Sequence, residues 1–388
     1  MSFSTYRYLL MTTDPVHIGT GGMRLGRVDN SIVREPGTRL PKVPGTSLSG
    51  AIRSYSAYRY GKRGCSGQGG HCGRPTCPIC YTFGSVGDGR SYSGVVSIGD
   101  ARLLLFPVYS MTGPVWVSTE GLLNEVGFTL DSSDTHLAKD SSDAPLTTMD
   151  WDKPLNLGWL MIKTPGKVKI KPPNEISIKE EWKTIGGRIV LISDKLFSQV
   201  VNSNLEVRTS VAIDPETGAA EKGALFTYEA IPRAAFLWLD VVVDDFRGAF
   251  PSKEQLEDWM EKLGGSNGHD QKNLVSNWHL WKKDDGQAKL KEEVQKSLGW
   301  IKDDLKRYEM STMPTPKDGW KNKMQKDNQD GPQYVITAGV EWIEHLGIGG
   351  MGTRGFGRVR ALASCEVDYQ TRTLNDCQSV KSSSKGVP

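Results

Sequence analysis

The chain has 388 residues, which is enough for two or three domains of ordinary size. Hydrophobic residues make up 37% and charged residues 24%, which excludes a disulfide-stapled miniprotein and a wholly disordered chain. The net charge of +3 conceals an uneven distribution: residues 1–100 carry twelve Lys and Arg against five Asp and Glu, and residues 101–160 carry three against eight. The N-terminal quarter is therefore where we expect a polyanion to bind.

The longest strongly apolar stretch, 234–243, is half of the roughly 20 residues that a helix needs to span a bilayer. The N-terminus has neither a basic segment nor a long apolar segment of the kind found in secretory signals. We therefore expect a cytoplasmic protein that does not contact a membrane.

The first half of the chain alternates strand-like segments with long loops. Residues 6–13 read as a strand, and 17–44 form a Gly-, Pro- and Arg-rich loop of a length that is usually functional. A helix is predicted over 44–60, because the apolar residues from Leu48 to Tyr55 share one face. Strands are expected on both sides of Asp100 within 94–109, followed by an exposed acidic insertion that begins at residue 130.

The second half contains more strands, a hairpin and a helical segment. Strands are predicted at 188–192, 207–213 and 235–243, and a Pro/Gly turn after 213 indicates a β-hairpin. Residues 251–331 carry fifteen Lys and Arg against fifteen Asp and Glu and read as helices. Their apolar stripe consists of Leu290, Val294, Leu298 and Ile301. A strand at 334–336, a short helix through Trp342 and His345, and a frayed tail are expected to follow.

A cysteine-rich loop follows the first helix. Four of the six cysteines lie within sixteen residues, together with a histidine: Cys65, His71, Cys72, Cys77 and Cys80. In a cytoplasmic chain this density favours a structural Zn²⁺ site over disulfides, with unliganded thiols as the alternative. The spacing of the first half is irregular, so His71 is a candidate replacement for one cysteine. No Glu lies nearby to act as the base of a catalytic zinc site, and Cys365 and Cys377 are expected to be ordinary thiols.

The second motif is a glycine-rich loop near the C-terminus. Gly347, Gly349 and Gly352 match G-x-G-x-x-G, but too little chain follows for the βαβ unit of a dinucleotide-binding fold. A P-loop is excluded because no Gly-Lys-Ser/Thr follows. Arg354 and Arg358 beside these glycines suit the close approach of a phosphate chain. A tight turn with no ligand is the alternative.

The third motif is the basic loop before the first helix. Arg24 and Arg27 belong to a set of basic residues that surrounds a single acid pair, Asp29 and Glu35. The helix start at Thr46 and Ser47 offers further N–H groups to an anion. The composition of the loop alone favours Asp29 as an ion-pair partner of an arginine. If RNA binds there, Asp29 would hold a divalent ion or orient a 2′-hydroxyl, and His17 could move a proton. Both interpretations stay open at this point.

Seven segments resemble one family and lie in its order along the chain. They are HIGTGG, VDNSIVREP, LPKVPGTSLSGAIR, CGRPTCPICYTFG, SIGDARLLLFPV, VRTSVAIDPETGAAEKGALFTYEAIP and GGMGTRGFGRV. Together they resemble the RAMP superfamily, specifically the repeated backbone subunit of type III CRISPR effector complexes. The segment DARLLLFPVYSMTGPVWVST favours the Cmr type over the Csm type. Residues 130–185 and 251–333 lie outside the resemblance.

The resemblance implies an α+β fold: a ferredoxin-like, RRM-related core with a β-hairpin thumb, a zinc-knuckle loop and a helical insertion. The core would cover 1–250 and 334–375, and a flexible tail would cover 376–388. Within the core lie the zinc-knuckle loop (64–82), the acidic insertion (130–185) and the thumb (207–228); the helical insertion is 251–333.

The resemblance also implies roles for individual residues. Asp29 matches the family's essential acid and His17 its loop histidine. The positions expected to contact RNA are Arg24, Arg27, Ser47, Arg53, Arg208, Gly350, Gly352, Thr353, Arg354 and Arg358. Base pairing between guide and target would determine sequence specificity, while the protein would contact the RNA backbone and recognise the shape of the duplex.

The implied function is a guide-RNA-binding backbone subunit that cuts complementary target RNA at regular intervals. The 2′-hydroxyl would attack the neighbouring phosphate with help from Mg²⁺ or Mn²⁺, leaving a 2′,3′-cyclic phosphate and a 5′-hydroxyl. The expected partners are guide CRISPR RNA, target RNA, further copies of the chain and other type III effector subunits. The alternatives are an architectural RNA-binding subunit without cleavage and a nuclease that matures precursor guide RNA.

Overall fold

The computed structural model describes residues 3–21, 28–67, 70–87, 90–131, 144–173, 178–309, 331–368, 370–371 and 373–379. The chain divides into two compact units. We call them the sheet unit (Thr5–Leu48, Ile98–Val241, Glu341–Pro388) and the helical unit (Met1–Ser4, Ser49–Ser97, Val242–Val340). Strands and helices both contribute, so the predicted α+β class is confirmed.

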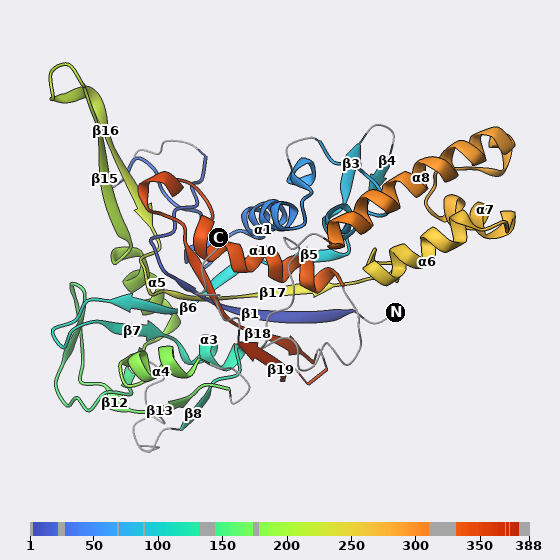
Figure 1. The fold of residues 1–388 in the computed structure, drawn as a ribbon. Helices are drawn as coiled ribbons and strands as arrows, with labels where there is room; N and C mark the ends of the chain where they lie inside the picture. Colours follow the sequence, from blue (N-terminus) through green and yellow to red (C-terminus); the bar gives the residue numbers. More distant parts are fainter. Residues whose placement is uncertain are drawn as a thin grey trace. The chain divides into compact units, whose positions relative to one another are not determined.

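The sheet unit is built on one large mixed sheet (Figure 1). The strand order in this sheet is β12-β9-β14-β7-β6-β17-β1-β18-β19, and β2 pairs with β6. The bounds are β1 (Ser4–Thr12), β2 (Lys42–Val43), β6 (Ala101–Val108), β7 (Val115–Ser118), β9 (Leu146–Thr147), β12 (Gly166–Lys167), β14 (Ile189–Leu191), β17 (Phe236–Val243), β18 (Val359–Val367) and β19 (Leu374–Ser379). β1 and β18 are antiparallel, with Thr5 opposite Val367, so segments from the two ends of the chain pair near the β19 edge of the sheet.

Long apolar runs place β6 and β17 at the centre of this sheet. Leu104, Phe106 and Trp238 are almost fully buried, as expected for strands that are covered on both faces. The predicted strands 6–13, 188–192 and 235–243 therefore exist within a residue or two. The expected hairpin is present as β15 (Glu206–Ile213) paired with β16 (Ala220–Ala230), and it projects from the sheet in Figure 1.

The acidic region after residue 130 is only partly the exposed insertion that the sequence predicts. Residues 132–143 and 174–177 lie outside the described part. The remainder forms β8 (Thr129–Asp131), β10 (Leu155–Leu157), β11 (Leu160–Ile162), β13 (Lys169–Lys171) and α4 (Lys179–Ile185). Leu155 and Leu157 are fully buried, and Val168 and Ile170 belong to the main hydrophobic core. The prediction relied on the acidic composition of the region, whereas its regularly spaced apolar residues are buried.

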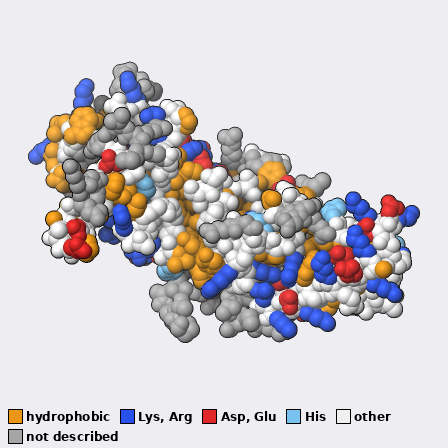
Figure 2. All heavy atoms as spheres, turned by 90° about the horizontal axis from the view of Figure 1, so that it is seen from above, with side chains coloured by type: hydrophobic (Ala, Val, Ile, Leu, Met, Phe, Trp, Pro, Cys, Tyr) orange, Lys and Arg blue, Asp and Glu red, His pale blue; other side chains and the backbone are white. Residues whose placement is uncertain are grey.

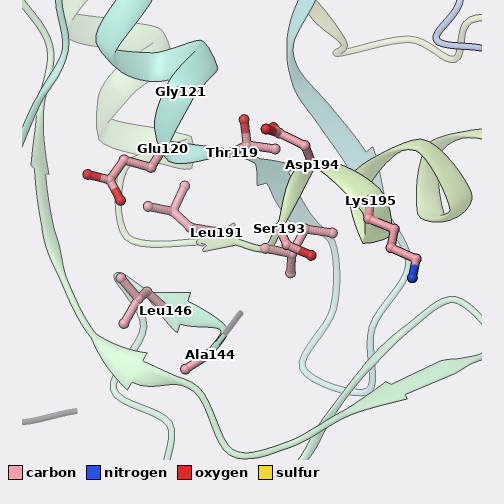
Figure 3. Close-up of a pocket in the computed structure, with 10 residues that line it drawn as sticks. Thr119, Glu120, Gly121, Ala144, Leu146, Leu191, Ser193, Asp194 and Lys195 are labelled. Atoms are coloured by element: carbon pink, nitrogen blue, oxygen red, sulfur yellow. The ribbon is translucent and has the colours of Figure 1, made fainter. Parts of the chain in front are cut away.

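A cavity of about 370 Å³ opens beside the parallel strands β7 and β14, at the start of α3 (Glu120–Glu125) and α5 (Asp194–Ser203). Glu120, Asp194 and Lys195 line it together with Thr119, Leu146 and Leu191 (Figure 3). Two carboxylates against one ammonium disfavour a polyanion there. None of the described residues predicted to bind RNA lines this cavity.

The helical unit contains most of α1 (Gly45–Arg59), the cysteine-rich loop and the helical insertion. Its helices and short strands are η1 (Arg63–Cys65), α2 (Pro78–Phe83), β3 (Ser85–Gly87), β4 (Arg90–Tyr92), β5 (Val96–Ile98), α6 (Lys253–Gly264), α7 (Gly268–Asn277), η2 (Lys283–Asp285), α8 (Gly286–Glu309) and α10 (Pro332–Leu346). The last residue of β5 and the last six residues of α10 belong to the sheet unit. The predicted stripe of α8 packs against α6 and α7, with Trp259 and Trp278 in edge contact. Basic and acidic side chains alternate over the surface of these helices (Figure 2).

Three predictions about the C-terminal part are wrong. Residues 334–336 open α10 instead of forming a strand, because Val335, Ala338 and Ile343 continue one buried helical face. Residues 376–379 belong to β19, so the flexible tail cannot begin at 376. Cys365 and Cys377 face each other on β18 and β19 and form a disulfide instead of remaining thiols.

Within the described residues, no helix is both long and apolar enough to cross a bilayer.

Candidate functional site

The loop that carries Asp29 is fixed to the base of the β15–β16 hairpin. The Oδ2 atom of Asp29 accepts hydrogen bonds from the backbone N–H and the hydroxyl of Thr227, both at 2.8 Å. The same hydroxyl accepts the N–H of Asp29 at 2.9 Å. Asn30 adds two backbone hydrogen bonds to the same strand, with Thr227 and Glu229. The carboxylate is therefore held in one place although its loop is long.

These contacts also determine the charge of Asp29. The hydrogen bond from the Thr227 backbone, followed by that from its hydroxyl, lowers the pKa of the carboxyl below its ordinary value. Asp29 is consequently ionised at neutral pH. A fixed, half-buried carboxylate of this kind can orient a hydroxyl group or bind a cation, but it is a weak base.

His17 lies beside the same strand and is buried. Its Nδ1 is 2.6 Å from the carbonyl oxygen of Glu229, so in the neutral ring Nδ1–H is the donor and Nε2 carries the lone pair. The ring contacts Tyr228 edge-on, and the His17 carbonyl accepts the N–H of Gly350 at 3.0 Å. His17 therefore connects the hairpin with the glycine-rich loop.

Glu229 is a site residue that the sequence did not single out. Its buried carboxylate binds Arg34 Nη2 at 2.6 Å and the backbone N–H of Ile32 at 3.2 Å. Thr227 and Glu229 lie two apart on one strand, so both side chains point to the same side. Two polar residues at alternate positions near the end of a strand are the sequence signal that could have identified Glu229.

The glycine-rich loop brings cationic side chains to the hairpin. It contains η3 (Gly352–Arg354), from which Arg354 donates to the Tyr228 hydroxyl at 3.2 Å. The Arg208 guanidinium lies 4.9 Å from the centre of the Phe356 ring. Arg358 pairs with Asp14, and the pairing raises the pKa of its guanidinium. Gly352, Thr353 and Arg354 are exposed, as a phosphate-binding loop requires.

The close approach of Gly349 to His17 predicts a measurable effect on stability. Gly349 has φ +78°, and a Cβ there would lie 2.4 Å from the His17 carbonyl oxygen, whereas a Cβ at Gly352 would meet nothing within 4 Å. We expect Gly349→Ala to lower the free energy of unfolding by at least about 2 kcal/mol, and Gly352→Ala by about 0.5 kcal/mol or less. Urea unfolding of both variants measures this, and equal losses would contradict it.

The remaining predicted RNA contacts are placed differently. Arg24 and Arg27 lie outside the described residues. At the start of α1 the Asp100 carboxylate already accepts the Gly45 N–H at 2.7 Å, so an anion does not meet a fully open helix end near Ser47. Arg53 points to the cysteine-rich loop, where it donates to the Cys65 carbonyl and to His71. Asp29, His17, Arg208, Arg354 and Gly350 are the predicted residues that the structure brings together.

The four cysteines of the loop converge on one point. The Sγ atom of Cys65 lies 3.9 Å from that of Cys77 and 3.7 Å from that of Cys80, and Cys72 and Cys80 are 3.8 Å apart. Four thiolates arranged tetrahedrally at zinc distances would be about 3.8 Å apart. Burial raises the pKa of the Cys77 thiol well above its ordinary value, so an unliganded thiolate there is unfavourable. The cluster is able to hold a metal ion.

His71 does not belong to this group of ligands. Its Nδ1 accepts a hydrogen bond of 2.8 Å from Arg53, and burial, followed by the charge of Arg53, lowers its pKa. The four cysteines alone supply the donor set.

Comparison with known proteins identifies the family. The RAMP superfamily model matches residues 9–360, and the chain belongs to this superfamily. It is 28% identical over 255 residues to the CRISPR system Cmr endoribonuclease Cmr4 of Pyrococcus furiosus, covering 60% of this chain and 80% of that relative. It is 40% identical over 81 residues to the Cms endoribonuclease Csm3 of Methanothermobacter thermautotrophicus, covering 20% of this chain and 32% of the relative.

Parts of the chain are also similar to solved structures. A chain of the type III-B Cmr-beta complex bound to cognate target RNA matches with a TM-score of 0.47 at 18% identity, covering 62% of this chain and 84% of that one. A chain of oligomeric Cmr4 from Pyrococcus furiosus matches with a TM-score of 0.39 at 22% identity, covering 66% and 89%.

Proposed function

We propose that the protein is a backbone subunit of a type III CRISPR effector complex that binds guide RNA and cuts complementary target RNA. The observation that carries the proposal is the ionised carboxylate of Asp29, fixed by Thr227 at the base of the hairpin. The endoribonuclease names of its Cmr4 and Csm3 relatives support it. The Cmr relative aligns with 60% of the chain and the Csm relative with 20%, which favours the Cmr type.

The proposed reaction is an in-line attack within the target RNA. The 2′-oxygen forms a bond to the adjacent phosphorus while the bond to the 5′-oxygen breaks. The 2′-hydroxyl loses a proton to solvent water and the leaving 5′-oxygen gains one from solvent water, giving a 2′,3′-cyclic phosphate and a 5′-hydroxyl. Asp29 accepts a hydrogen bond from the 2′-hydroxyl and orients it, and the exposed Arg354 binds a phosphate without taking part in bond breaking.

A divalent cation fits beside Asp29 only together with the RNA. Mg²⁺ is usually bound through one or two carboxylates plus substrate phosphates, and Asp29 is ionised and half-buried. Within the described part of the chain, no group of three ligating side chains includes Asp29. A bound Mg²⁺ or Mn²⁺ would neutralise developing negative charge on the phosphate; the protein's own task is to hold Asp29 in place.

The hairpin supplies a surface of the kind that the proposal needs. Val207, Val211, Ile213 and Leu225 are exposed apolar side chains on β15 and β16. An exposed hairpin with apolar side chains can insert between base steps, where unstacking is offset by new contacts. Its position beside Asp29 would distort the target nucleotide next to the carboxylate.

The reconstituted complex with guide RNA tests the proposal directly. With Mg²⁺, we expect a labelled complementary RNA to be cut into a regular ladder whose fragments end in 2′,3′-cyclic phosphates. A 2′-deoxy substitution at one cut position should remove that band alone, because the attacking oxygen is missing, while a non-complementary RNA stays intact. Tight binding without any ladder would favour the architectural alternative. Cutting of precursor guide RNA without a divalent ion would favour the guide-maturing alternative.

We also propose that the cysteine cluster holds a structural Zn²⁺. Four thiolates satisfy the tetrahedral coordination of zinc and leave no open position for a reacting water. Cys65, Cys77 and Cys80 are buried in a core that includes Ile79 and Tyr81. The loop has few apolar side chains of its own, so the bound ion would supply the stability that hydrophobic packing does not provide there.

A further inference from the structure

The last turns of α8 contact the cysteine loop, which we define as residues 61–80. Asp304 on α8 is buried, with 2% of its side chain exposed. Its carboxylate binds the Lys62 ammonium on one oxygen and accepts a 2.8 Å hydrogen bond from the Thr76 hydroxyl on the other. Lys62 and Thr76 are themselves buried.

A buried carboxylate in a helix of this kind requires an explanation. The α8 helix has a polar, solvated side on which an aspartate would cost nothing, whereas removing a charge from water costs several kcal/mol unless it is paired and hydrogen-bonded. Asp303, its neighbour, is 59% exposed. Among the described residues, Asp304 is stabilised by the two groups of the cysteine loop and by Arg307, whose Nε lies 3.4 Å away.

The two partners of Asp304 belong to different halves of the metal cluster. Lys62 precedes η1 and Cys65, and Thr76 directly precedes Cys77. One carboxylate thus holds both the segment that supplies the first cysteine and the segment that supplies the knuckle. The Sγ atoms of Cys65 and Cys77 lie 3.9 Å apart across this junction.

Three neighbouring contacts act on the same segments. Arg307 donates to the Gly61 carbonyl, before Cys65. The Arg74 guanidinium lies 5.4 Å from the centre of the Trp300 ring and 3.8 Å from Asp303, before Cys77. Trp300, Asp304 and Arg307 follow one another at helical spacing, so about two turns of α8 carry every one of these contacts.

We propose that Asp304 is a positioning residue for the cysteine cluster, and that the helical insertion thereby fixes the distance between its two halves. The inference rests on the proposed zinc site. Four thiolates brought together repel one another, so a loop held in the ligand geometry before the ion arrives binds zinc more tightly than a free one. Loss of the Thr76–Asp304 hydrogen bond would free the segment that carries Cys77 and Cys80 without removing any of the four cysteines.

Paired variants of the full-length chain separate this role from a general loss of stability. Thr76→Val removes only the hydroxyl, and Thr76→Ser keeps it; Asp304→Asn removes the buried charge, and Glu292→Gln removes an exposed charge from an earlier turn of the same helix. In competition with a chromogenic chelator, we expect the zinc Kd to rise at least about tenfold for Thr76→Val and Asp304→Asn. The zinc Kd of Thr76→Ser and Glu292→Gln should stay within about threefold of wild type.

Cobalt substitution supplies a readout that stability alone does not move. The d–d absorption of Co²⁺ reports tetrahedral thiolate coordination, and it should shift or broaden in Thr76→Val but not in Thr76→Ser. Unchanged zinc affinity and unchanged cobalt spectra in Thr76→Val and Asp304→Asn would overturn the inference. A wild-type chain that binds no zinc would instead overturn the metal site itself. Should Asp304→Asn fail to fold, the Thr76 pair decides the question.

Discussion

Asp29→Asn is expected to remove the target-RNA cleavage ladder while leaving target binding intact. The substitution keeps the size of the side chain and an oxygen that can accept from Thr227, so the loop should stay attached to the hairpin. What it removes is the negative charge that orients the 2′-hydroxyl and binds a cation. Loss of a group in such a role lowers rates by about 10²- to 10⁴-fold. Single-turnover cleavage by the assembled complex measures the rate, and a filter-binding assay measures target affinity.

Glu35→Gln provides the matched control, because it neutralises the other acid of the same loop. Glu35 accepts a hydrogen bond from Thr38 and makes no contact with the hairpin strand in the described structure. Its cleavage rate should remain close to that of wild type. A ladder of normal intensity from Asp29→Asn would move catalysis to another residue or another subunit.

The low pKa of Asp29 adds a pH dependence to this prediction. Because Thr227 lowers that pKa, the carboxylate stays charged from alkaline pH down to below the ordinary aspartate value. Protonation of Asp29 should therefore not slow cleavage between about pH 5 and pH 8. Thr227→Val would raise the pKa towards its ordinary value and would move the acid limb of the profile to higher pH.

The main elements of the sheet could be predicted because their signals are local. The β6 and β17 segments are continuous apolar runs, and the helices of the insertion repeat their apolar residues at helical spacing. The same reasoning failed for 334–336, since three β-branched or aromatic residues in a row fit a strand and a buried helix start equally well. Only the packing of Val335 in the core of the helical unit decides between them.

The site could be predicted in part for a similar reason. The resemblance located Asp29, His17 and the glycine-rich loop, but the contacts that make them a site join residues about 200 positions apart, such as Asp29 and Thr227. A composition of arginines around an acid does not reveal which arginine faces RNA. Arg53 was expected to bind RNA, and in the structure it donates to the cysteine loop.

Removal of the metal is expected to destabilise the helical unit strongly. Cys65, Cys77 and Cys80 lie in one hydrophobic core with Tyr60, Phe250 and Val335, so a loop that opens without its ion exposes that core. Structural zinc contributes about 10 kcal/mol or more to the folding of small zinc domains. If one third of that applies here, the melting temperature should fall by about 10 °C. Differential scanning fluorimetry before and after treatment with a chelator at neutral pH measures the shift.

Cys77→Ser should reproduce the effect without a chelator, because a serine hydroxyl does not replace a thiolate at zinc. Ser66→Ala lies in the same loop outside the four ligands and should melt like wild type. Added zinc should restore the chelated wild type and leave Cys77→Ser unchanged. Since each thiol must lose its proton to bind the ion, lowering the pH should weaken zinc binding and lower the melting temperature of the wild type more than that of Cys77→Ser. Identical melting of the chelated and the zinc-loaded wild type would show that the cluster is not a structural metal site.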